Sequence, residues 1–365
     1  MWGRNYVCIA RCIGGVCKKA QGLPAELVGD GARRYYQYRG AKDIASLYAH
    51  QSLQLRPNVY LMADLQYAYK RYRLYDEKYV GNEFSVPYHF LNPRLGLNYN
   101  ASSKLNFYIN LSRTSREPRL KNLYDAAESS TPASWGPVVP QFATRPDGSL
   151  DFSQPLVKPE KLTDVEFGFG WKTSALSASA NLFYMDFRDE IIKKGGLDRF
   201  GQPRTGNAER TLHQGIELSA GLKLRPQVEL QGNVHFSKNE LKRYTVYTSD
   251  GTPIRLDGNP IAGFPQTLAN LRATYSWHHL YLSLAMQYVG KQYTDNFKNE
   301  ANTVDPYTVF NLNVRYQFQT PWLKGLVLQG RVMNLFNKKY FMYGVDQEFF
   351  PAATRNAFLS LQFIL

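Results

Sequence analysis

The chain has 365 residues, of which 44% are hydrophobic, and no apolar run approaches the eighteen or so residues that a membrane-spanning helix needs, which excludes a helical membrane protein. Aromatic residues make up 14% of the chain, which favours strands over helices. The net charge of +14 would suit an anionic partner, but the Lys and Arg residues are scattered instead of gathered on one element, which argues against nucleic acid.

The first 35 residues differ from the rest of the sequence. Cys8, Cys12 and Cys17 are the only cysteines, and no second Cys/His group completes a tetrahedral metal site, so we expect no metal and no cofactor. Arg11 interrupts the apolar part of this stretch, and no small-residue cleavage site follows, which makes it a poor signal peptide. We expect residues 1–35 to lie outside the main domain, as a disordered segment or an artefact of truncation.

The rest of the chain, residues 36–365, alternates apolar and polar residues. In KLNFYINLS, residues 104–112, Leu105, Phe107 and Ile109 share one side, and such a period of two predicts a strand with two unlike faces. The pattern predicts thirteen strands, near residues 47–55, 59–69, 95–99, 105–111, 165–171, 176–184, 216–224, 228–236, 271–277, 280–288, 312–318, 326–332 and 357–363.

The connections between these strands alternate in length. Tight turns are expected at residues 56–58, 100–103, 173–175, 225–227, 278–279 and 320–325, and long polar segments at 74–87, 115–159, 194–210, 244–266, 295–306 and 341–351. Short turns at one end and long loops at the other are typical of an up-and-down outer-membrane barrel. A soluble sandwich with Greek-key connections lacks this alternation, and no repeat of 40 to 50 residues indicates a propeller.

The two faces of the predicted strands support the same interpretation. Aromatic residues end the apolar faces near the tight turns (Tyr99, Trp171, Trp277, Phe318) and near the long loops (Tyr69, Tyr184, Phe236, Tyr288), as in the two interfacial girdles of a barrel. The other face is polar, and a wide barrel tolerates such an interior. Its members are Glu166, Glu217, Lys223, Glu229, Asn233, Arg272, Asn313, Arg315, Gln317 and Arg331. The apolar face is therefore predicted to contact lipid.

Several segments resemble motifs of the TonB-dependent outer-membrane receptors. GRVMNLFNKKYFMYG, residues 330–344, resembles the segment on the penultimate strand of that family. SRTSREPRLKNLY (112–124), KPEKLTDVEFGF (158–169), FYMDFRDEI (183–191) and GNAERTLHQGIEL (206–218) resemble further motifs in the family's order. The resemblance covers roughly residues 36–365. It implies an all-β, antiparallel transmembrane β-barrel in the cell outer membrane, whose thirteen strands correspond to the C-terminal part of a 22-stranded barrel.

The family's signal peptide, TonB box and plug have no counterpart in this sequence. An antiparallel sheet with an odd number of strands does not close by ordinary antiparallel pairing, and an open edge in lipid leaves backbone groups that cost several kcal/mol each. We therefore expect a gene remnant, a fragment that awaits its other half or, as the favoured interpretation, a truncated reading of a longer coding region.

The resemblance implies energy-dependent uptake of a scarce ligand, such as a ferric siderophore or a similar chelate. It also implies four kinds of partner: the TonB complex (through a missing N-terminal region), the barrel-assembly machinery, lipopolysaccharide with outer-membrane lipids, and the ligand. Loop cations and aromatic rings could bind an anionic chelate. The candidate ligand-binding residues are Arg113, Arg116, Arg119, Tyr124, Trp135, Arg199, Arg204 and Arg210. Residues that match family motifs and are expected to be structural are Glu117, Pro118, Glu160, Asn207, Gly215, Glu217, Asn334, Leu335, Phe336, Tyr340 and Arg355.

Two other function classes compete with the receptor interpretation. An outer-membrane hydrolase would need a catalytic histidine, but none of the six histidines lies in a nucleophile motif or beside a paired carboxylate, so no enzyme is expected. A passive outer-membrane pore, or a truncated remnant without function, is the alternative to a receptor.

The truncation hypothesis makes a prediction about the gene. The DNA just upstream should encode a plug and nine further strands. Sequencing of that region tests the idea, which fails if no reading frame there contains them.

Overall fold

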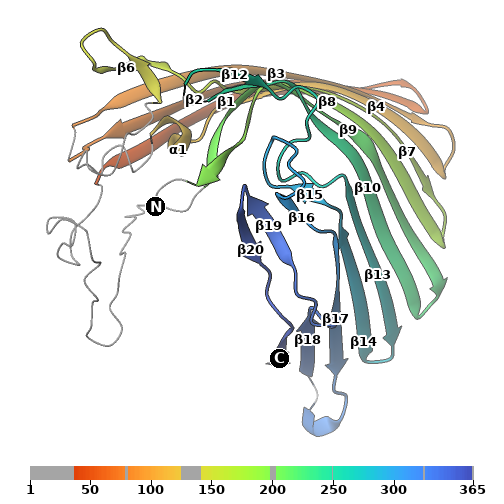
Figure 1. Ribbon diagram of the computed structural model, residues 1–365. Helices are drawn as coiled ribbons and strands as arrows, with labels where there is room; N and C mark the ends of the chain where they lie inside the picture. The colour runs from red at the N-terminus through yellow and green to blue at the C-terminus, as the bar shows by residue number, and fades with distance from the viewer. Residues whose placement is uncertain are drawn as a thin grey trace, which may run out of the picture. The chain divides into compact units, whose positions relative to one another are not determined.

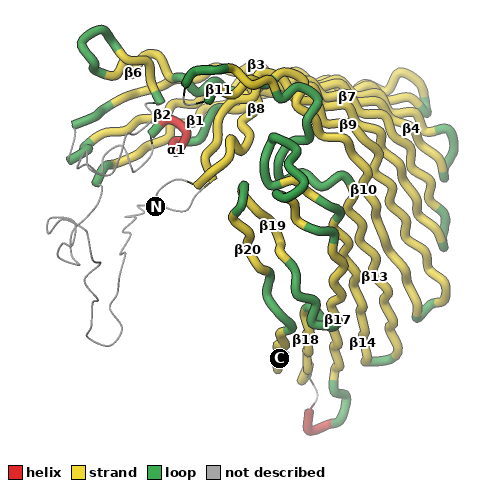
Figure 2. The backbone as a smooth tube through the Cα atoms, viewed as in Figure 1, coloured by secondary structure: helices red, strands yellow, loops and turns green. Residues whose placement is uncertain are grey.

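The computed structural model describes residues 37–78, 81–124, 141–197, 203–248, 250–323 and 325–363. These residues are mostly strand, with two short helical segments, α1 (Leu120–Leu123) and η2 (Pro321–Leu323) (Figure 2). No helix in those ranges is long and apolar enough to cross a membrane. The predictions for residues 1–35, including the three cysteines, lie outside the described residues.

Thirteen of the described strands form one sheet, which confirms the predicted number and the all-β class. From β3 to β21, each strand pairs antiparallel with its neighbour in the order β1-β2-β3-β4-β7-β8-β9-β10-β13-β14-β17-β18-β21 (Figure 1). Their bounds are β1 (Arg39–Arg56), β2 (Val59–Tyr75), β3 (Phe84–Asn100), β4 (Leu105–Arg116), β7 (Glu160–Lys172), β8 (Leu176–Leu197), β9 (Pro203–Arg225), β10 (Val228–Arg243), β13 (Thr267–Trp277), β14 (Leu280–Val289), β17 (Tyr307–Gln317), β18 (Leu326–Met333) and β21 (Asn356–Phe363).

The remaining described strands are short hairpins inside the long connections. Turns of a few residues join the main strands at one end. At the other end, four of the six connections carry these hairpins, and the described parts of the connections between β2 and β3 and between β8 and β9 carry none. The hairpins pair β5 (Phe142–Thr144) with β6 (Leu150–Pro155), β11 (Thr245–Tyr247) with β12 (Pro253–Arg255), β15 (Gln292–Tyr293) with β16 (Thr303–Val304), and β19 (Phe341–Val345) with β20 (Glu348–Pro351).

Strands of the main sheet extend several residues into two of the predicted loops. Strand β8 continues to Leu197 and β9 begins at Pro203, so most of the predicted loop 194–210 is strand, with a register shift between Lys193 and Leu197. Strand β3 begins at Phe84, inside the predicted loop 74–87. The boundary predictions were wrong because Gly195 and Gly196 interrupt the apolar alternation of β8, and Pro87 resembles a turn signal although it lies within β3.

The chain divides into two compact units. The first comprises Met1–Ala45, Tyr69–Tyr88 and Pro118–Val157, and the second comprises Ser46–Ala68, His89–Glu117 and Lys158–Leu365. In the first unit, aromatic rings form a small core in which the ring centroids of Phe84 and Phe142 lie 5.0 Å apart, as do those of Phe142 and Phe152. Phe142 and Phe152 belong to the hairpin β5–β6, which therefore packs in this core. Leu123 of helix α1 is also fully buried.

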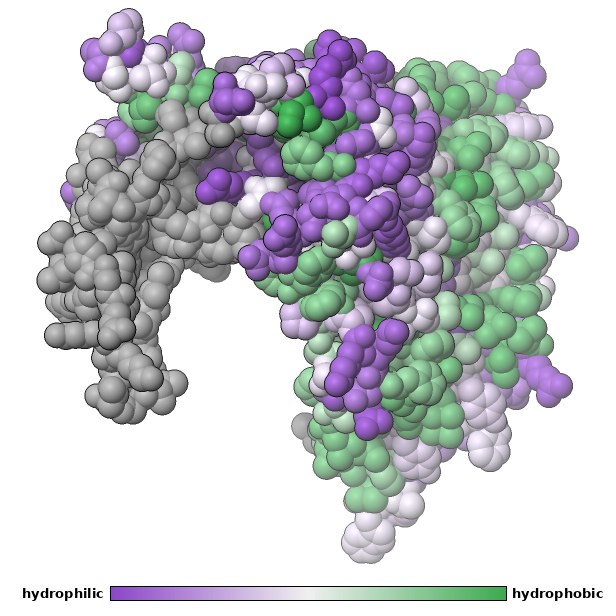
Figure 3. All heavy atoms as spheres, viewed as in Figure 1, coloured by the Kyte–Doolittle hydropathy of each residue, from purple (hydrophilic) through white to green (hydrophobic). Residues whose placement is uncertain are grey.

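The second unit exposes its apolar side chains on one face of its strands. Every second side chain along a strand points to this face. Ile109, Phe167 and Leu182 are examples, and they are exposed to 39%, 46% and 50%, although a soluble protein would bury them. In Figure 3, hydrophobic side chains gather along the strands and hydrophilic ones gather over the loops. An exposed apolar face of this extent fits contact with acyl chains.

Only glycine fits at position 215 of β9, because a neighbouring strand lies very close to it. A Cβ atom at this position would lie 2.1 Å from the backbone oxygen of Phe236 on β10 and 2.8 Å from Cζ of Phe183 on β8. Real Cβ atoms do not come so close, so the pairing of β9 with β10 requires glycine here. The residue belongs to the motifs that were expected to be structural.

Gly215→Ala should therefore destabilise the sheet by about 1–3 kcal/mol or more, because the backbone of β10 must shift. Gly330→Ala on β18 is the matched control, since a Cβ atom there meets nothing within 4 Å. Urea unfolding of both variants, monitored by the heat-dependent shift in gel mobility, measures the difference in stability. Equal stabilities would contradict the close approach.

Candidate functional site

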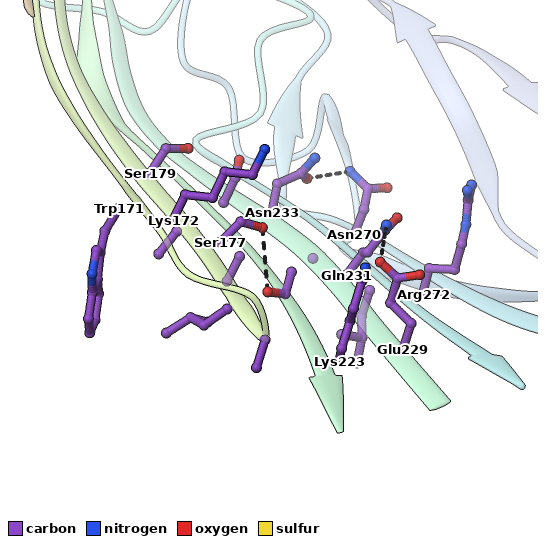
Figure 4. A pocket seen from close by; sticks show the side chains of 18 of the residues that line it. Trp171, Lys172, Ser177, Ser179, Lys223, Glu229, Gln231, Asn233, Asn270 and Arg272 are labelled. Carbon is purple, nitrogen blue, oxygen red and sulfur yellow. Dashed lines mark hydrogen bonds between the residues drawn. The ribbon is translucent and has the colours of Figure 1, made fainter. Parts of the chain in front are cut away.

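The polar face of the second unit forms a cavity of about 1110 Å³ near the short turns. Its side chains come from neighbouring strands, and Figure 4 shows Asn233 of β10 and Asn270 of β13 pointing toward each other, with a hydrogen bond of 2.9 Å between Asn270 Nδ2 and Asn233 Oδ1. Gln231 Nε2 donates to Glu229 Oε1 at 2.9 Å. Four residues predicted to face the interior, Lys223, Glu229, Asn233 and Arg272, line this cavity.

Amides and hydroxyls make up most of the polar side chains in the cavity lining. Ser177, Ser179 and Ser219 lie beside Lys172 and Lys223, while Glu229 is the one carboxylate among the lining residues that the structure describes. A surface of this kind can exchange hydrogen bonds with water or with a polar solute. Among the described residues, no three His, Cys, Asp or Glu side chains are grouped as metal ligands would be.

At the opposite ends of the strands, hydrogen bonds link four segments of the second unit into a rim. Asn296, which is 4% exposed, donates from Nδ2 to the backbone oxygen of Lys193 at 2.7 Å and accepts from the N–H of Ala262 at 2.9 Å. The carboxylate of Asp346 accepts from the N–H of Gly196, and the Asp346 N–H donates to the Thr294 oxygen at 2.9 Å. The end of β8, the segment before β13, the segment after β14 and the hairpin β19–β20 are thus held together.

The rim carries cations that have no carboxylate partner. Lys193 is half-buried, and its Nζ lies 5.6 Å from the ring centroid of Tyr343, while Arg204 is exposed beside Gly196. Neither side chain forms an ion pair within the described residues. Burial lowers the pKa of Lys193, because a charged ammonium loses hydration there. An anion bound at the rim would offset that loss. Of the two, the sequence predicted only Arg204.

The predicted ligand-binding residues do not all share one face. Arg116 of β4 lies on the polar face, where its Nε contacts Glu160 Oε1 of β7 at 2.6 Å. Arg113 has the opposite parity and lies with Leu111 on the apolar face, and Arg210 shares that face on β9, where its Nε donates to Asp186 Oδ1 at 2.9 Å. The outward placement of Arg113 and Arg210 separates them from the cavity.

The other candidates belong to the first unit or lie outside the described residues. Arg119 is exposed and precedes helix α1, whereas Tyr124 is 1% exposed and lies in the aromatic core with its Oη 3.1 Å from Asn82 Nδ2. Trp135 and Arg199 lie outside the described residues.

The motif residues make backbone contacts typical of structural positions. Asn207 of β9 donates from Nδ2 to the backbone oxygens of Lys158 at 2.9 Å and Asp189 at 2.6 Å. Asn334, at φ +51°, bonds through its side chain to the backbone of Lys338 and Ala353 and so closes the turn after β18.

The remaining motif residues lie beside these contacts or pair locally. Glu117 and Pro118 are buried, and Glu160 Oε2 also accepts from the N–H of Ile191 at 3.1 Å. The other contacts are Glu217 Oε1 with His235 Nδ1 at 3.1 Å, the Leu335 N–H donating to the Phe310 oxygen, Phe336 against the Phe310 ring, Tyr340 against the Tyr307 ring, and the Arg355 N–H donating to Asn337 Oδ1.

Lipid-facing strands, a polar inner face and loops gathered at one end define this protein as part of an outer-membrane β-barrel. A family model described as "TonB dependent receptor-like, beta-barrel" matches residues 19–335. The chain therefore belongs to the TonB-dependent receptor family, whose barrels reside in the outer membrane and whose members are transporters, not enzymes. The resemblance found in the sequence motifs is thereby confirmed.

Solved structures share the fold at low sequence identity. The siderophore receptor PiuA from Acinetobacter baumannii is 16% identical with a TM-score of 0.66, and the match covers 89% of this chain and 44% of that receptor. The ferric citrate transporter FecA is 18% identical with a TM-score of 0.65, over 91% and 46%. The copper transporter OprC is 16% identical with a TM-score of 0.65, over 89% and 50%. The chain thus spans about half the length of these proteins. No curated protein sequence gave a match.

The hydrogen bonds of the rim predict the effect of Asn296→Ala. The change leaves the Lys193 carbonyl and the Ala262 N–H without their partner, which costs about 1–3 kcal/mol locally. Peptides that contain residues 193–196 and 261–264 should exchange their amide hydrogens faster with deuterium. Asn299→Ala at an exposed position is the control. Unchanged exchange in the Asn296 variant would contradict the linked rim.

Proposed function

We propose that this chain is the barrel part of a TonB-dependent receptor that takes up an anionic chelate, such as a ferric siderophore, across the outer membrane. The observation that carries the proposal is the rim of the second unit, where Lys193 and Arg204 present positive charge without a carboxylate partner, above a polar inner face. Metal chelates of carboxylates, catecholates or hydroxamates are commonly anionic, so this charge suits them.

The linked rim supports a binding role for a second reason. Hydrogen bonds from Asn296 and Asp346 hold the segments around Lys193 in fixed positions. A cation that is fixed before the ligand arrives loses little conformational entropy on binding. The Tyr343 ring beside Lys193 adds a flat surface against which a planar ligand can pack.

A receptor that takes up its ligand in this way would need further partners. Energy for uptake would come from the TonB complex, and insertion would use the barrel-assembly machinery. The solved relatives include a siderophore receptor, a ferric citrate transporter and a copper transporter. Among these cargoes, the unpaired rim cations favour an anionic iron chelate over a bare metal cation.

Binding of ferric citrate and of a ferric catecholate to the purified chain in detergent tests the proposal. Lys193→Gln and Arg204→Gln should each weaken binding about three- to tenfold, as expected for the loss of a charge-assisted contact. Lys104→Gln, which removes an exposed charge near the short turns, is the control. A rim variant that binds both chelates as tightly as the parent chain would refute the proposed site.

The pH dependence of binding provides a further prediction. Because burial lowers the pKa of Lys193, its charge is lost at a lower pH than that of a free lysine. Chelate affinity should therefore fall as the pH rises from 7 toward about 10, and Lys193→Gln should flatten this fall. A passive pore would instead show an ionic conductance in planar bilayers that no chelate blocks.

A further inference from the structure

The apolar face of the second unit ends in a set of cations at the ends of the strands that carry the long loops. Six cations, Arg113, Lys161, Arg188, Arg210, Lys238 and Lys242, lie on five adjacent strands from β4 to β10. We call these six residues the outer cation row. Because side chains alternate along each strand, these six point to the same face as the lipid-facing residues Leu111, Tyr184 and Phe236.

The register places like charges directly opposite one another. Lys161 of β7 is the cross-strand partner of Arg188 of β8, and Arg188 is in turn the partner of Arg210 of β9. Like charges in such positions repel one another and destabilise a sheet. A nearby anion would reduce the repulsion among these three side chains.

The chain itself supplies anions to only part of the row. Asp186 accepts from Arg210 Nε at 2.9 Å, and Glu240 Oε2 lies 2.7 Å from Lys242 Nζ and also pairs with Lys238. Within the described part of the chain, Arg113, Lys161 and Arg188 have no ion pair or hydrogen bond through their side chains, and all three are exposed. Half of the row is therefore without a counter-charge.

The height of the row matches the headgroup level of a bilayer. Strand residues rise about 3.3 Å each, so Arg113, eight residues beyond Leu105, lies about 26 Å along the tilted strand β4 from its short turn. Because outer-membrane strands tilt by about 35–45°, this path corresponds to a height of about 20 Å, compared with about 25 Å for the apolar band. The row therefore lies near the edge of this band on the side of the long loops.

We propose that the outer cation row binds the phosphate groups of outer-leaflet lipid, with Arg113, Lys161 and Arg188 as the principal contacts. A bidentate arginine geometry suits a phosphate oxygen pair, and the neighbouring lysine adds a second positive charge. The apolar face below accommodates the acyl chains of the same molecule. This site lies on the outward face, so it does not depend on the proposed chelate site.

Binding of bisphosphorylated lipid A to the full chain in detergent with EDTA, counted by native mass spectrometry and titrated for affinity, tests the proposal. Arg113→Gln, Lys161→Gln and Arg188→Gln combined should weaken binding at least about tenfold and reduce its salt dependence. The combination of Arg56→Gln, Lys104→Gln and Arg225→Gln, which removes three exposed charges near the short turns, should leave the affinity within about twofold.

Two further measurements complete the test. Arg188→Lys keeps the charge and should retain most of the affinity, and the heat-dependent gel shift shows that each variant is folded. The proposal is overturned if the triple row variant binds lipid A as tightly as the parent chain. It is also overturned if inorganic phosphate binds the row as tightly as lipid A does, since the acyl chains would then contribute nothing.

Discussion

In hydrocarbon no water is available to pair with a backbone N–H or C=O group, and each unsatisfied group costs several kcal/mol. The main sheet meets this constraint through the ladders between neighbouring strands, such as the continuous pairing of β4 with β7 from Leu105 to Arg116. Because side chains alternate along each strand, one face is then free to contact lipid while the other remains polar. Ile109 and Asn110, which are adjacent in the sequence, therefore lie in opposite environments.

This alternation also separates two roles for positive charge. Cations of inward parity lie on the polar face or on the linked rim. Lys193 of the rim is half-buried and forms no ion pair within the described residues. Cations that follow the outward parity, such as Lys161 and Arg188, end the lipid-facing surface instead. In the proposed roles, rim cations would bind a ligand on one side of the sheet, and the outer cation row would bind membrane phosphates on the other.

Much of the fold could be predicted from the sequence, because the alternation that lipid contact requires is strong in strands such as β4 and β14. The extension of β8 to Leu197 could not, since the two lysines and two glycines at positions 193–196 carry no apolar pattern. The candidate site was predicted less well. Arg113 and Arg116 were grouped by nearness in the sequence, although their parity places them on opposite faces. Lys193 was missed because its surroundings come from segments far along the chain.

The orientation of the two faces is the central claim, and collision measurements on spin labels test it most directly. After replacement of Cys8, Cys12 and Cys17 by Ser, a nitroxide is attached at position 109 or 110 of the full chain in liposomes. We predict that the label at Ile109 collides with dissolved oxygen and is shielded from a water-soluble nickel complex, and that the label at Asn110 shows the reverse. A label at Ile109 that is shielded from both reagents, as in a packed soluble core, would contradict the account.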